Sequence, residues 1–297
     1  MNPAPGDARP VLIVGATGRI GSEVIRLLLA QGISVRALVR PGSPLTLPGA
    51  AGVEVVSGEL GGRASLDSAV RGVAACVVAV RDHPDQAQWE SALIDTLETH
   101  APVPLVKVSA FAASLSPPPG YGRVHAEVED KLRRSTLPWT VLQPYMYMQN
   151  LLDMATPVRK LGCLPLPLGR CRVAFIDARD VARAAAGVLV AGEHAGQTHV
   201  LTGGQALSGA DLATALSEVL DRRVRYLAVP QALASLLMRA DGVSRWDVAM
   251  RAELFAMLRE NGESRTSDAC TRLTGTAPTS VHAFLRDHRP VFSDGLY

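Results

Sequence analysis

Short apolar runs alternate with helix-length amphipathic segments through the first half of the chain. Apolar runs predict strands at 11–14, 34–39, 53–57, 75–80, 103–108 and 140–142. Helical spacing of apolar positions falls between them, near 19–31, 65–71, 86–99 and 122–135. Strands that are apolar throughout and alternate with helices are typical of a parallel sheet covered on both faces. The pattern therefore predicts an α/β fold with a doubly wound parallel sheet, whose ligand lies at the carboxyl ends of the strands.

The first crossover carries three glycines at the spacing of a phosphate-binding loop. Gly15 follows the apolar run 11–14 directly, and Gly18 and Gly21 lead into the next helix. Gly15 permits a sharp turn, Gly18 lets a pyrophosphate approach the backbone, and Gly21 lets the helix pack close to the strand. The helix N-terminus offers unpaired N–H groups and partial positive charge to the phosphates. The loop predicts a Rossmann-type dinucleotide site with further contacts from Thr17, Arg19 and Ile20.

The pattern changes after residue 150. A segment punctuated by prolines, 161–169, cannot form a helix or a central strand. Short strands are expected at 172–176, 198–201 and 224–229, and helices at 178–191, 209–220, 230–240 and 244–260. We therefore expect a Rossmann domain made of residues 10–155 and about 178–200. A smaller α+β substrate-binding or lid domain would comprise residues 156–177 and about 201–297.

The composition is that of a globular protein and argues against several classes of partner. The chain has 297 residues, of which 47% are hydrophobic and 20% charged, and its net charge of +2 gives no basic surface for a nucleic acid. The four cysteines are scattered without the spacing of metal ligands, so no metal is expected. Residues 1–10 lack an apolar signal core, and no apolar run reaches the length of a membrane span. We expect a cytoplasmic protein without a membrane partner, either a monomer or a homodimer.

The end of the second expected strand indicates which coenzyme is bound. An acidic residue at this position would bind the ribose 2′-hydroxyl of NAD and repel a 2′-phosphate. Here the strand ends in Arg40, and no acidic residue follows until Glu54. A planar guanidinium suits a phosphate dianion, and Arg19 in the glycine loop offers a second donor. The sequence therefore favours NADP(H) over NAD(H).

Several further motifs occur together with the glycine loop. They are Val35–Arg40, Gly58-Glu-Leu60, Ser65-Leu66, Val128-Glu129 with Leu132, Leu137–Pro144, Asn150-Leu151 and Ile176–Ala182. In this combination the chain resembles the NmrA-like branch of the atypical short-chain dehydrogenases/reductases, over about residues 10–230. The resemblance implies a Rossmann domain, a smaller C-terminal substrate domain and NADP(H) in the cleft. It also implies one of several activities: reduction of ketones, quinones, azo compounds or enones, or redox sensing without turnover.

The chain departs from the family pattern at three places. The family often has Asp where Glu59 stands near the adenine, and Arg where Gln143 stands. Short-chain reductases commonly use a Tyr-x-x-x-Lys pair, whereas the matching segment here has Tyr121 and His125. The resemblance also places Ser109 where the family uses a serine to hold the substrate oxygen.

The replacement of lysine by histidine leaves two routes for the proton. In a helix, Tyr121 and His125 share one face, but an imidazole with a reference pKa of about 6.5 is mostly neutral at pH 7 and gives a tyrosinate little support. The chain has three lysines, Lys107, Lys131 and Lys160, and none stands at a position where it could replace the lysine of the Tyr-x-x-x-Lys pair. Either Tyr121 or His125 still delivers the proton, or the protein aligns substrate and NADPH while water or a phenol of the substrate delivers it. Both routes are physically sound, because alignment can contribute more than a general acid.

Aromatic and methionine residues predict a pocket for a bulky apolar substrate. They follow a strand end or occupy the helices expected after residue 230: Tyr145, Tyr147, Asn150, Trp246 and Met250. A composition rich in Arg, Ala and Pro is typical of a high-GC genome, where such reductases serve polyketide antibiotic pathways. We therefore expect an NADPH-dependent ketoreductase acting on an aromatic, angucyclinone-type polyketide. A quinone or azo reductase and a non-catalytic NADP(H) redox sensor are the alternatives.

Overall fold

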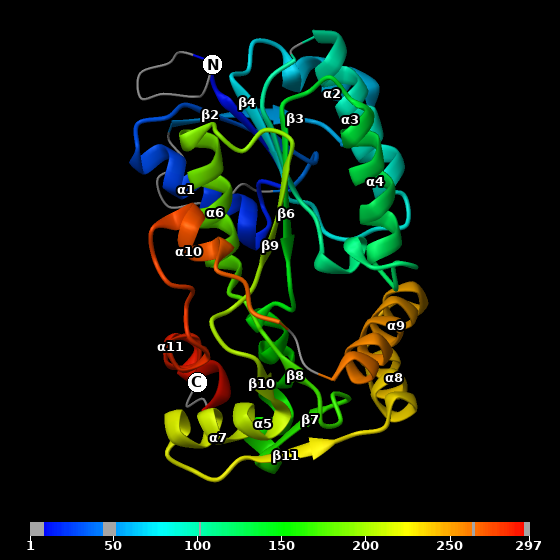
Figure 1. Ribbon diagram of the computed structural model, residues 1–297, viewed down its shortest axis with the longest axis vertical. Coiled ribbons are helices and arrows are strands. Elements are labelled where there is room, and N and C mark those ends of the chain that lie inside the picture. The colour runs from blue at the N-terminus through cyan, green and yellow to red at the C-terminus, as the bar shows by residue number, and fades with distance from the viewer. Residues whose placement is uncertain (1–8, 44–51, 101, 263–264, 294–297) are drawn as a thin grey trace. The chain divides into compact units, whose positions relative to one another are not determined.

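The chain divides into two compact units, each built from three separate stretches. A computed structural model describes residues 9–43, 52–100, 102–262 and 265–293 (Figure 1). The first unit comprises Met1–Ser114, Gly122–Pro144 and Arg179–Val200, and the second comprises Leu115–Tyr121, Tyr145–Ala178 and Leu201–Tyr297. No helix in the described ranges is long and apolar enough to cross a membrane.

The first unit contains a seven-stranded sheet in the order β3-β2-β1-β4-β5-β6-β9. The strands are β1 (Val11–Val14), β2 (Val35–Val39), β3 (Val53–Ser57), β4 (Ala75–Val78), β5 (Leu105–Val108), β6 (Trp139–Pro144) and β9 (Gln197–Leu201). Neighbouring strands from β3 to β6 are parallel. The chain reverses its direction of winding between β1 and β4, so the expected doubly wound parallel sheet is confirmed.

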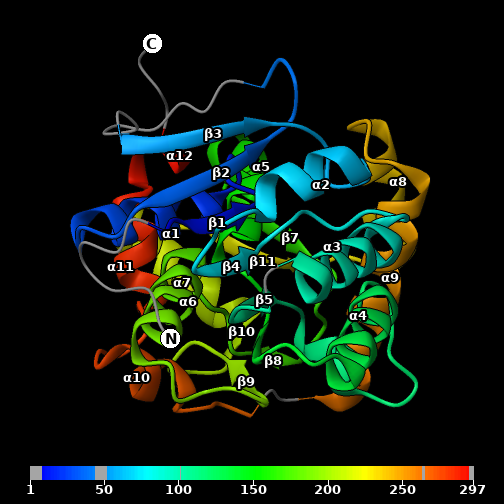
Figure 2. The ribbon, with the colours of Figure 1, turned by 90° about the horizontal axis from the view of Figure 1, so that it is seen from above.

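Helices cover the two faces of this sheet (Figures 1 and 2). One face carries α2 (Arg63–Val70), α3 (Gln86–His100) and α4 (Gly122–Arg134), whose buried residues Leu66, Leu97 and Leu132 join the core with Leu12 and Leu105. The other face carries α1 (Arg19–Ala30) and α6 (Ala178–Ala191). Strands β1, β4 and β5 are buried at every position, as a sheet covered on both faces requires.

Two strand predictions need correction. Strand β3 forms an edge of the sheet, and Glu54, Val55 and Ser57 are exposed, so this strand is not covered on both faces. Strand β4 ends at Val78 rather than at residue 80, and just beyond it the Ala79 carbonyl oxygen lies close to Gly15 of the glycine loop. Helix boundaries in this unit otherwise lie within two residues of the predicted ones.

The second unit is built from short strands and helices. Two small sheets pair β7 (Cys163–Leu166) with β11 (Arg225–Ala228) and β8 (Arg172–Val173) with β10 (Leu207–Ser208). The larger predicted helices are present as α7 (Gly209–Leu220), α8 (Gln231–Ala240) and α9 (Arg245–Asn261). Pro165 lies in β7, which within the described ranges pairs with β11 alone, so the proline-punctuated segment forms an edge strand, where a missing N–H is tolerated.

Several elements of the second unit differ from the prediction. The strand expected at 172–176 ends at Val173, because Ile176 instead exchanges backbone hydrogen bonds with Met146 and Met148. The sequence also gave no indication of four short helices, which are α5 (Ala155–Leu161), α10 (Ala269–Thr274), α11 (Val281–Asp287) and α12 (Arg289–Phe292). Each has at most seven residues, which is too few for a clear helical period.

Candidate functional site

The loop between β1 and α1 has no room for side chains at two of its glycines. Gly15 has a φ of +87°, and a Cβ there would lie 2.2 Å from the carbonyl oxygen of Ala79. A Cβ at Gly21 would lie 2.3 Å from the carbonyl oxygen of Gly15. Both glycines are therefore required by close backbone approaches within the first unit.

The N-terminus of α1 is left open for an anion. Gly18 is the N-cap residue, so no side chain satisfies the first N–H groups, and the first turn contains no acidic residue. Thr17, Gly18 and Arg19 are exposed and Ile20 is partly buried. Unsatisfied donors at the positive end of a helix dipole bind phosphate well. The residues present therefore fit the pyrophosphate of a dinucleotide.

The two residues expected near the adenosine half are both on the surface of the first unit. Arg40 directly follows β2, is exposed and has no carboxylate partner among the described residues. The nearest acidic residue in the sequence, Glu54, is instead paired with Arg36, with Nε and Oε2 separated by 2.9 Å. Glu59 is exposed just beyond β3, where its backbone N–H contacts the Ser65 hydroxyl. An arginine without a competing carboxylate fits a 2′-phosphate.

Ser109 lies at the carboxyl end of β5, but its hydroxyl donates to a buried carboxylate. The Ser109 Oγ is 2.5 Å from Oε1 of Glu129, a residue of α4 that is 1% exposed. Gln143 and Arg133 also donate to this carboxylate, at 2.9 and 2.8 Å. Gln143 thus occupies the family's arginine position with a neutral donor, while Arg133 supplies the charge. Since the proton of Ser109 is directed at Glu129, its oxygen is left to a ligand only as an acceptor.

His125 lies on α4 and pairs with a residue that the sequence had not indicated. Its Nε2 is 3.0 Å from Oδ1 of Asp82, which follows β4. The imidazole is 5% exposed and the Asp82 side chain 35%. His125 Nδ1 is buried and has no hydrogen-bond partner in the structure. The only signal in the sequence was a charged residue shortly after the end of a parallel strand.

Tyr121 belongs to the second unit and directly precedes α4. Its hydroxyl is 3.1 Å from Oδ1 of Asp247 on α9, and its ring packs edge-on against Trp246 at 5.4 Å between centroids. The backbone N–H of Gly120 donates to Glu253 at 2.9 Å, and a Cβ at Gly120 would lie 2.5 Å from the carbonyl oxygen of Met250. The structure thus brings the predicted residues Tyr121, Trp246 and Met250 together. A carboxylate beside the phenol opposes the negative charge that a lysine would favour.

Lys107 forms a buried ion pair within the first unit. Its Nζ lies 2.8 Å from Oε2 of Glu90 and donates to the Val108 carbonyl at 2.8 Å, and both charged side chains are 1% exposed. Gln86 donates to the same carboxylate at 2.7 Å. Burial, with a further contribution from the charge of Glu90, raises the pKa of the neighbouring Cys76 thiol. The Lys107 ammonium is therefore paired with Glu90 inside the first unit.

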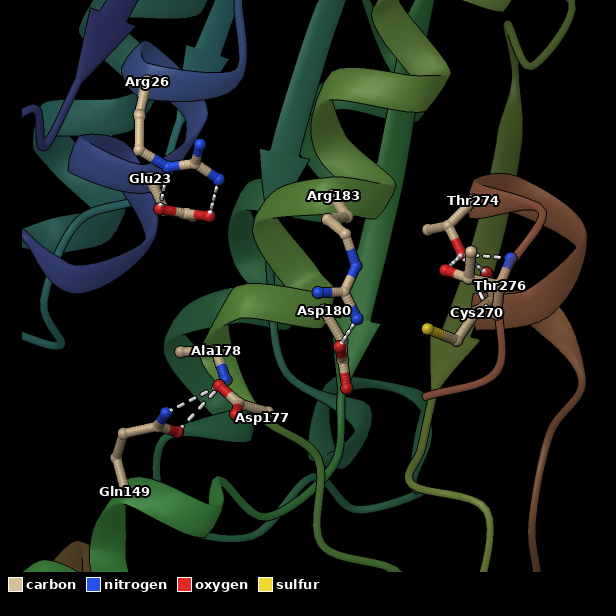
Figure 3. A network of polar contacts seen from close by, with 10 residues as sticks. All are labelled: Glu23, Arg26, Gln149, Asp177, Ala178, Asp180, Arg183, Cys270, Thr274 and Thr276. Carbon is tan, nitrogen blue, oxygen red and sulfur yellow. Dashed lines mark hydrogen bonds and ion pairs between the residues drawn. The ribbon is translucent and has the colours of Figure 1, made fainter. Parts of the chain in front are cut away.

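The predicted substrate residues Tyr145, Tyr147 and Asn150 lie on a separate stretch of the second unit. This stretch leads into the 3-10 helix η3 (Met148–Met154), where Tyr145 and Tyr147 are half-buried and Asn150 is exposed. Gln149 fixes the stretch by donating to Asp177 at 2.8 Å and accepting from the Ala178 N–H at 3.1 Å (Figure 3). This explains the Ile176–Ala182 motif, in which Asp177 is fully buried.

Two proteins that are similar to this chain in sequence are reductases. The chain is 34% identical over 282 residues to an NAD(P)H azoreductase of Xenophilus azovorans, covering 95% of this chain and 99% of the relative. It is 35% identical over 234 residues to a (4-alkanoyl-5-oxo-2,5-dihydrofuran-3-yl)methyl phosphate reductase of Streptomyces griseus, covering 77% and 81%.

A solved structure shares the fold across almost the whole chain. The NADPH-dependent quinone oxidoreductase of Escherichia coli, complexed with NADPH, superposes with a TM-score of 0.84 at 26% identity, over 94% of this chain and 99% of that one. The sequence model of the NmrA-like family matches residues 7–285. Together with the glycine loop and its parallel sheet, this match shows that the chain belongs to the NmrA-like family.

Proposed function

We propose that this protein is an NADPH-dependent reductase of bulky, apolar, aromatic small molecules. The observation that carries the proposal is the uncapped N-terminus of α1 behind a glycine loop that has no room for side chains. The azoreductase and quinone oxidoreductase relatives support a reductase. When bound, NADPH supplies the hydride.

The residues of the first unit have separate parts in this proposal. The N–H groups at the start of α1, with Thr17, Arg19 and Ile20, hold the pyrophosphate. Arg40 pairs with the 2′-phosphate, because its guanidinium has no carboxylate partner among the described residues. Glu59 lies on the adenosine side of the sheet, beyond β3. The ends of β4 and β5, which carry Asp82 and Ser109, lie on the nicotinamide side.

Two kinds of acceptor fit an aromatic substrate: a ring ketone of a polyketide, as the sequence suggests, and a quinone or azo compound. The hydroxyls of Ser109 and Tyr121 donate to Glu129 and Asp247. In this arrangement neither holds a proton for a ketone oxygen. Quinones and azo compounds need a protein acid less, so this geometry favours them, and the azoreductase relative supports the same choice.

The proposal is tested by mixing the purified protein with NADPH and a panel of quinones, azo dyes and polycyclic ketones. We expect NADPH to be consumed with a quinone or azo acceptor, and the consumption is measured as the loss of absorbance at the NADPH band. Arg40→Ala should weaken NADPH binding about tenfold and leave NADH binding unchanged, because only NADPH carries the 2′-phosphate. Tight NADPH binding without turnover across the panel would contradict the reductase and favour a redox sensor.

The variant Tyr121→Phe separates the two kinds of acceptor. If a ketone is reduced with Tyr121 as general acid, kcat falls about 10²–10⁴-fold. For a quinone or azo acceptor we expect kcat to stay within about threefold, because the variant removes the hydroxyl contact with Asp247 and not a proton donor that the reaction needs. Tyr226→Phe is a matched control, since its hydroxyl bonds to backbone carbonyls of Leu166 and Gly169 in the same unit.

A further inference from the structure

In the pair formed by Asp82 and His125, the histidine is buried and the aspartate is partly exposed to solvent. The imidazole of His125 is 5% exposed and both of its nitrogens are enclosed: Nε2 by Asp82, and Nδ1 by surrounding atoms that offer no hydrogen bond. Asp82 is 35% exposed. His125 therefore cannot meet a ligand directly while this pair is intact, whereas Asp82 can.

The hydrogen-bond pattern fixes which atoms carry protons. A tautomer with its proton on Nδ1 would bury that N–H donor without an acceptor, which is costly. The neutral tautomer with its proton on Nε2 places that donor on Asp82 and leaves Nδ1 as a lone pair. Asp82 then keeps its second carboxylate oxygen, which has no partner among the described residues, as a further acceptor.

Asp82 lies in the loop after β4, on the side of the sheet where we place the nicotinamide. Ala79, three residues earlier, contacts the glycine loop through its carbonyl oxygen. Strands β1 and β4 flank the point where the direction of winding reverses, and ligands of doubly wound sheets lie outside the carboxyl ends of the strands at this point. Asp82 follows β4 on the side away from β2 and β3, which serve the adenosine half.

We propose that Asp82 binds a hydroxyl or amide N–H donor of the ligand, and that His125 is a positioning residue that orients this carboxylate. The donor belongs either to the nicotinamide nucleotide half of the coenzyme or to the substrate, since both present such groups at this end of the sheet. This inference rests on the proposed reductase function. It assigns Asp82 a ligand contact and gives His125 a role other than direct proton transfer.

The variant Asp82→Asn tests the contact because it reverses the hydrogen bonding of the exposed atom. The Nε2–H of His125 would hold the Asn oxygen, so the amide NH₂ would face the ligand as a donor instead of an acceptor. Loss of a charge-assisted hydrogen bond should weaken binding of the ligand that carries the donor about tenfold to a hundredfold. Calorimetry of NADPH binding to the coenzyme-free protein identifies a coenzyme donor, and KM for the acceptor identifies a substrate donor.

Asp85→Asn is the matched control. It removes the same charge three residues away, from a carboxylate that is 58% exposed and 3.7 Å from His83. Removing a negative charge should by itself strengthen binding of an anionic coenzyme. Weaker binding in Asp82→Asn alone therefore supports a specific hydrogen bond. The inference is overturned if Asp82→Asn leaves both the NADPH Kd and the KM of the acceptor as in Asp85→Asn.

The role of His125 is tested by its tautomer and by a conservative variant. Long-range ¹H–¹⁵N spectra of the coenzyme-free protein should show the Nε2–H tautomer, and an Nδ1–H tautomer would overturn the assignment. His125→Gln retains an N–H donor for Asp82, so its ligand affinity should lie closer to the wild type than that of His125→Ala. Equal loss in both variants would contradict positioning. Failure of the wild-type protein to bind NADPH would instead refute the proposed function, while the tautomer measurement would still test the pair.

Discussion

The polar side chains near the strand ends each bond to an acidic residue distant in the sequence. Ser109 bonds to Glu129, His125 to Asp82, and the buried Lys107 to Glu90. Pairing stabilises buried polar groups, because desolvation without a partner costs about 1–3 kcal/mol per group. These partners decide what remains for a ligand: an acceptor at Ser109, an acceptor at Asp82, and nothing at Lys107.

Gly15→Ala should destabilise the protein and abolish dinucleotide binding. The new Cβ would lie 2.2 Å from the Ala79 carbonyl oxygen, in a residue with a φ of +87°. We expect a loss of about 2 kcal/mol or more in the free energy of unfolding, measured by urea denaturation. Gly72→Ala is the control, because Gly72 also has a positive φ of +69° but nothing within 4 Å of its Cβ position. It should lose about 1 kcal/mol and keep NADPH binding; equal losses in the two variants would contradict the steric argument.

The buried thiol of Cys76 should make stability fall at alkaline pH. In the folded state, burial and, to a lesser extent, the charge of Glu90 raise the pKa of the Cys76 thiol above the ordinary cysteine value of 9.0. A raised folded pKa gives stability that is complete below the unfolded value and lost as the pH rises above it, because only the unfolded chain ionises. Between pH 9 and 11 this group should remove about 1.4 kcal/mol per pH unit. Cys76→Ala should unfold with a shallower pH dependence, whereas an unchanged slope would disprove the assignment.

The N-termini of α1 and α7 differ in how their first N–H groups are satisfied. Helix α1 begins at Gly18 without a capping side chain. Helix α7 has a complete capping box, in which the Ser208 side chain accepts from the Asp211 N–H and the Asp211 side chain accepts from the Ser208 N–H. The backbone hydrogen bond from Ser208, followed by its hydroxyl, lowers the pKa of Asp211. Helix α1 therefore offers uncapped N–H groups directly behind the glycine loop, whereas the first N–H groups of α7 are satisfied by its capping box.

Ser208→Ala should destabilise the protein by about 1 kcal/mol without affecting the coenzyme. The variant removes the hydroxyl that accepts from the Asp211 N–H at 3.2 Å, at a helix that contains no predicted site residue. Urea denaturation measures the loss, and calorimetry with NADPH provides the comparison. An NADPH Kd that rises together with the loss of stability would show that α7 contributes to the site after all.

At the scale of the whole molecule, the two compact units interrupt one another in the sequence. The first unit takes α6 and β9 from residues 179–200, after a long stretch of the second unit. In the sheet, β9 is the neighbour of β6. Helix α6 buries Val181, Ala185 and Leu189. A chain cut after the sixth strand therefore lacks both a strand and a covering helix.

A fragment ending at Pro144 should consequently fail to fold cooperatively. It leaves the edge of β6 unpaired and the face beneath α6 uncovered. Joining residues 179–200 to this fragment through a flexible Gly/Ser linker should restore a single cooperative urea transition. Circular dichroism and the dispersion of amide NMR signals compare the two fragments. A cooperative transition in the shorter fragment would show that the late segment is dispensable.

The sequence by itself determined the alternation of strands and helices, the doubly wound fold class, the glycine loop and the family. These features depend on local periodicity and on backbone conformations that only certain residues adopt, so they can be predicted from neighbouring positions in the sequence. The second unit was harder to predict, because its short strands and helices are defined by long-range pairing, as in the exchange between Ile176 and Met146. For the same reason, the sequence identified His125 and Ser109 but not their partners. Only the tertiary structure brought Asp82 to His125 and Glu129 to Ser109, since hydrogen bonds between buried groups form between residues that the chain places far apart.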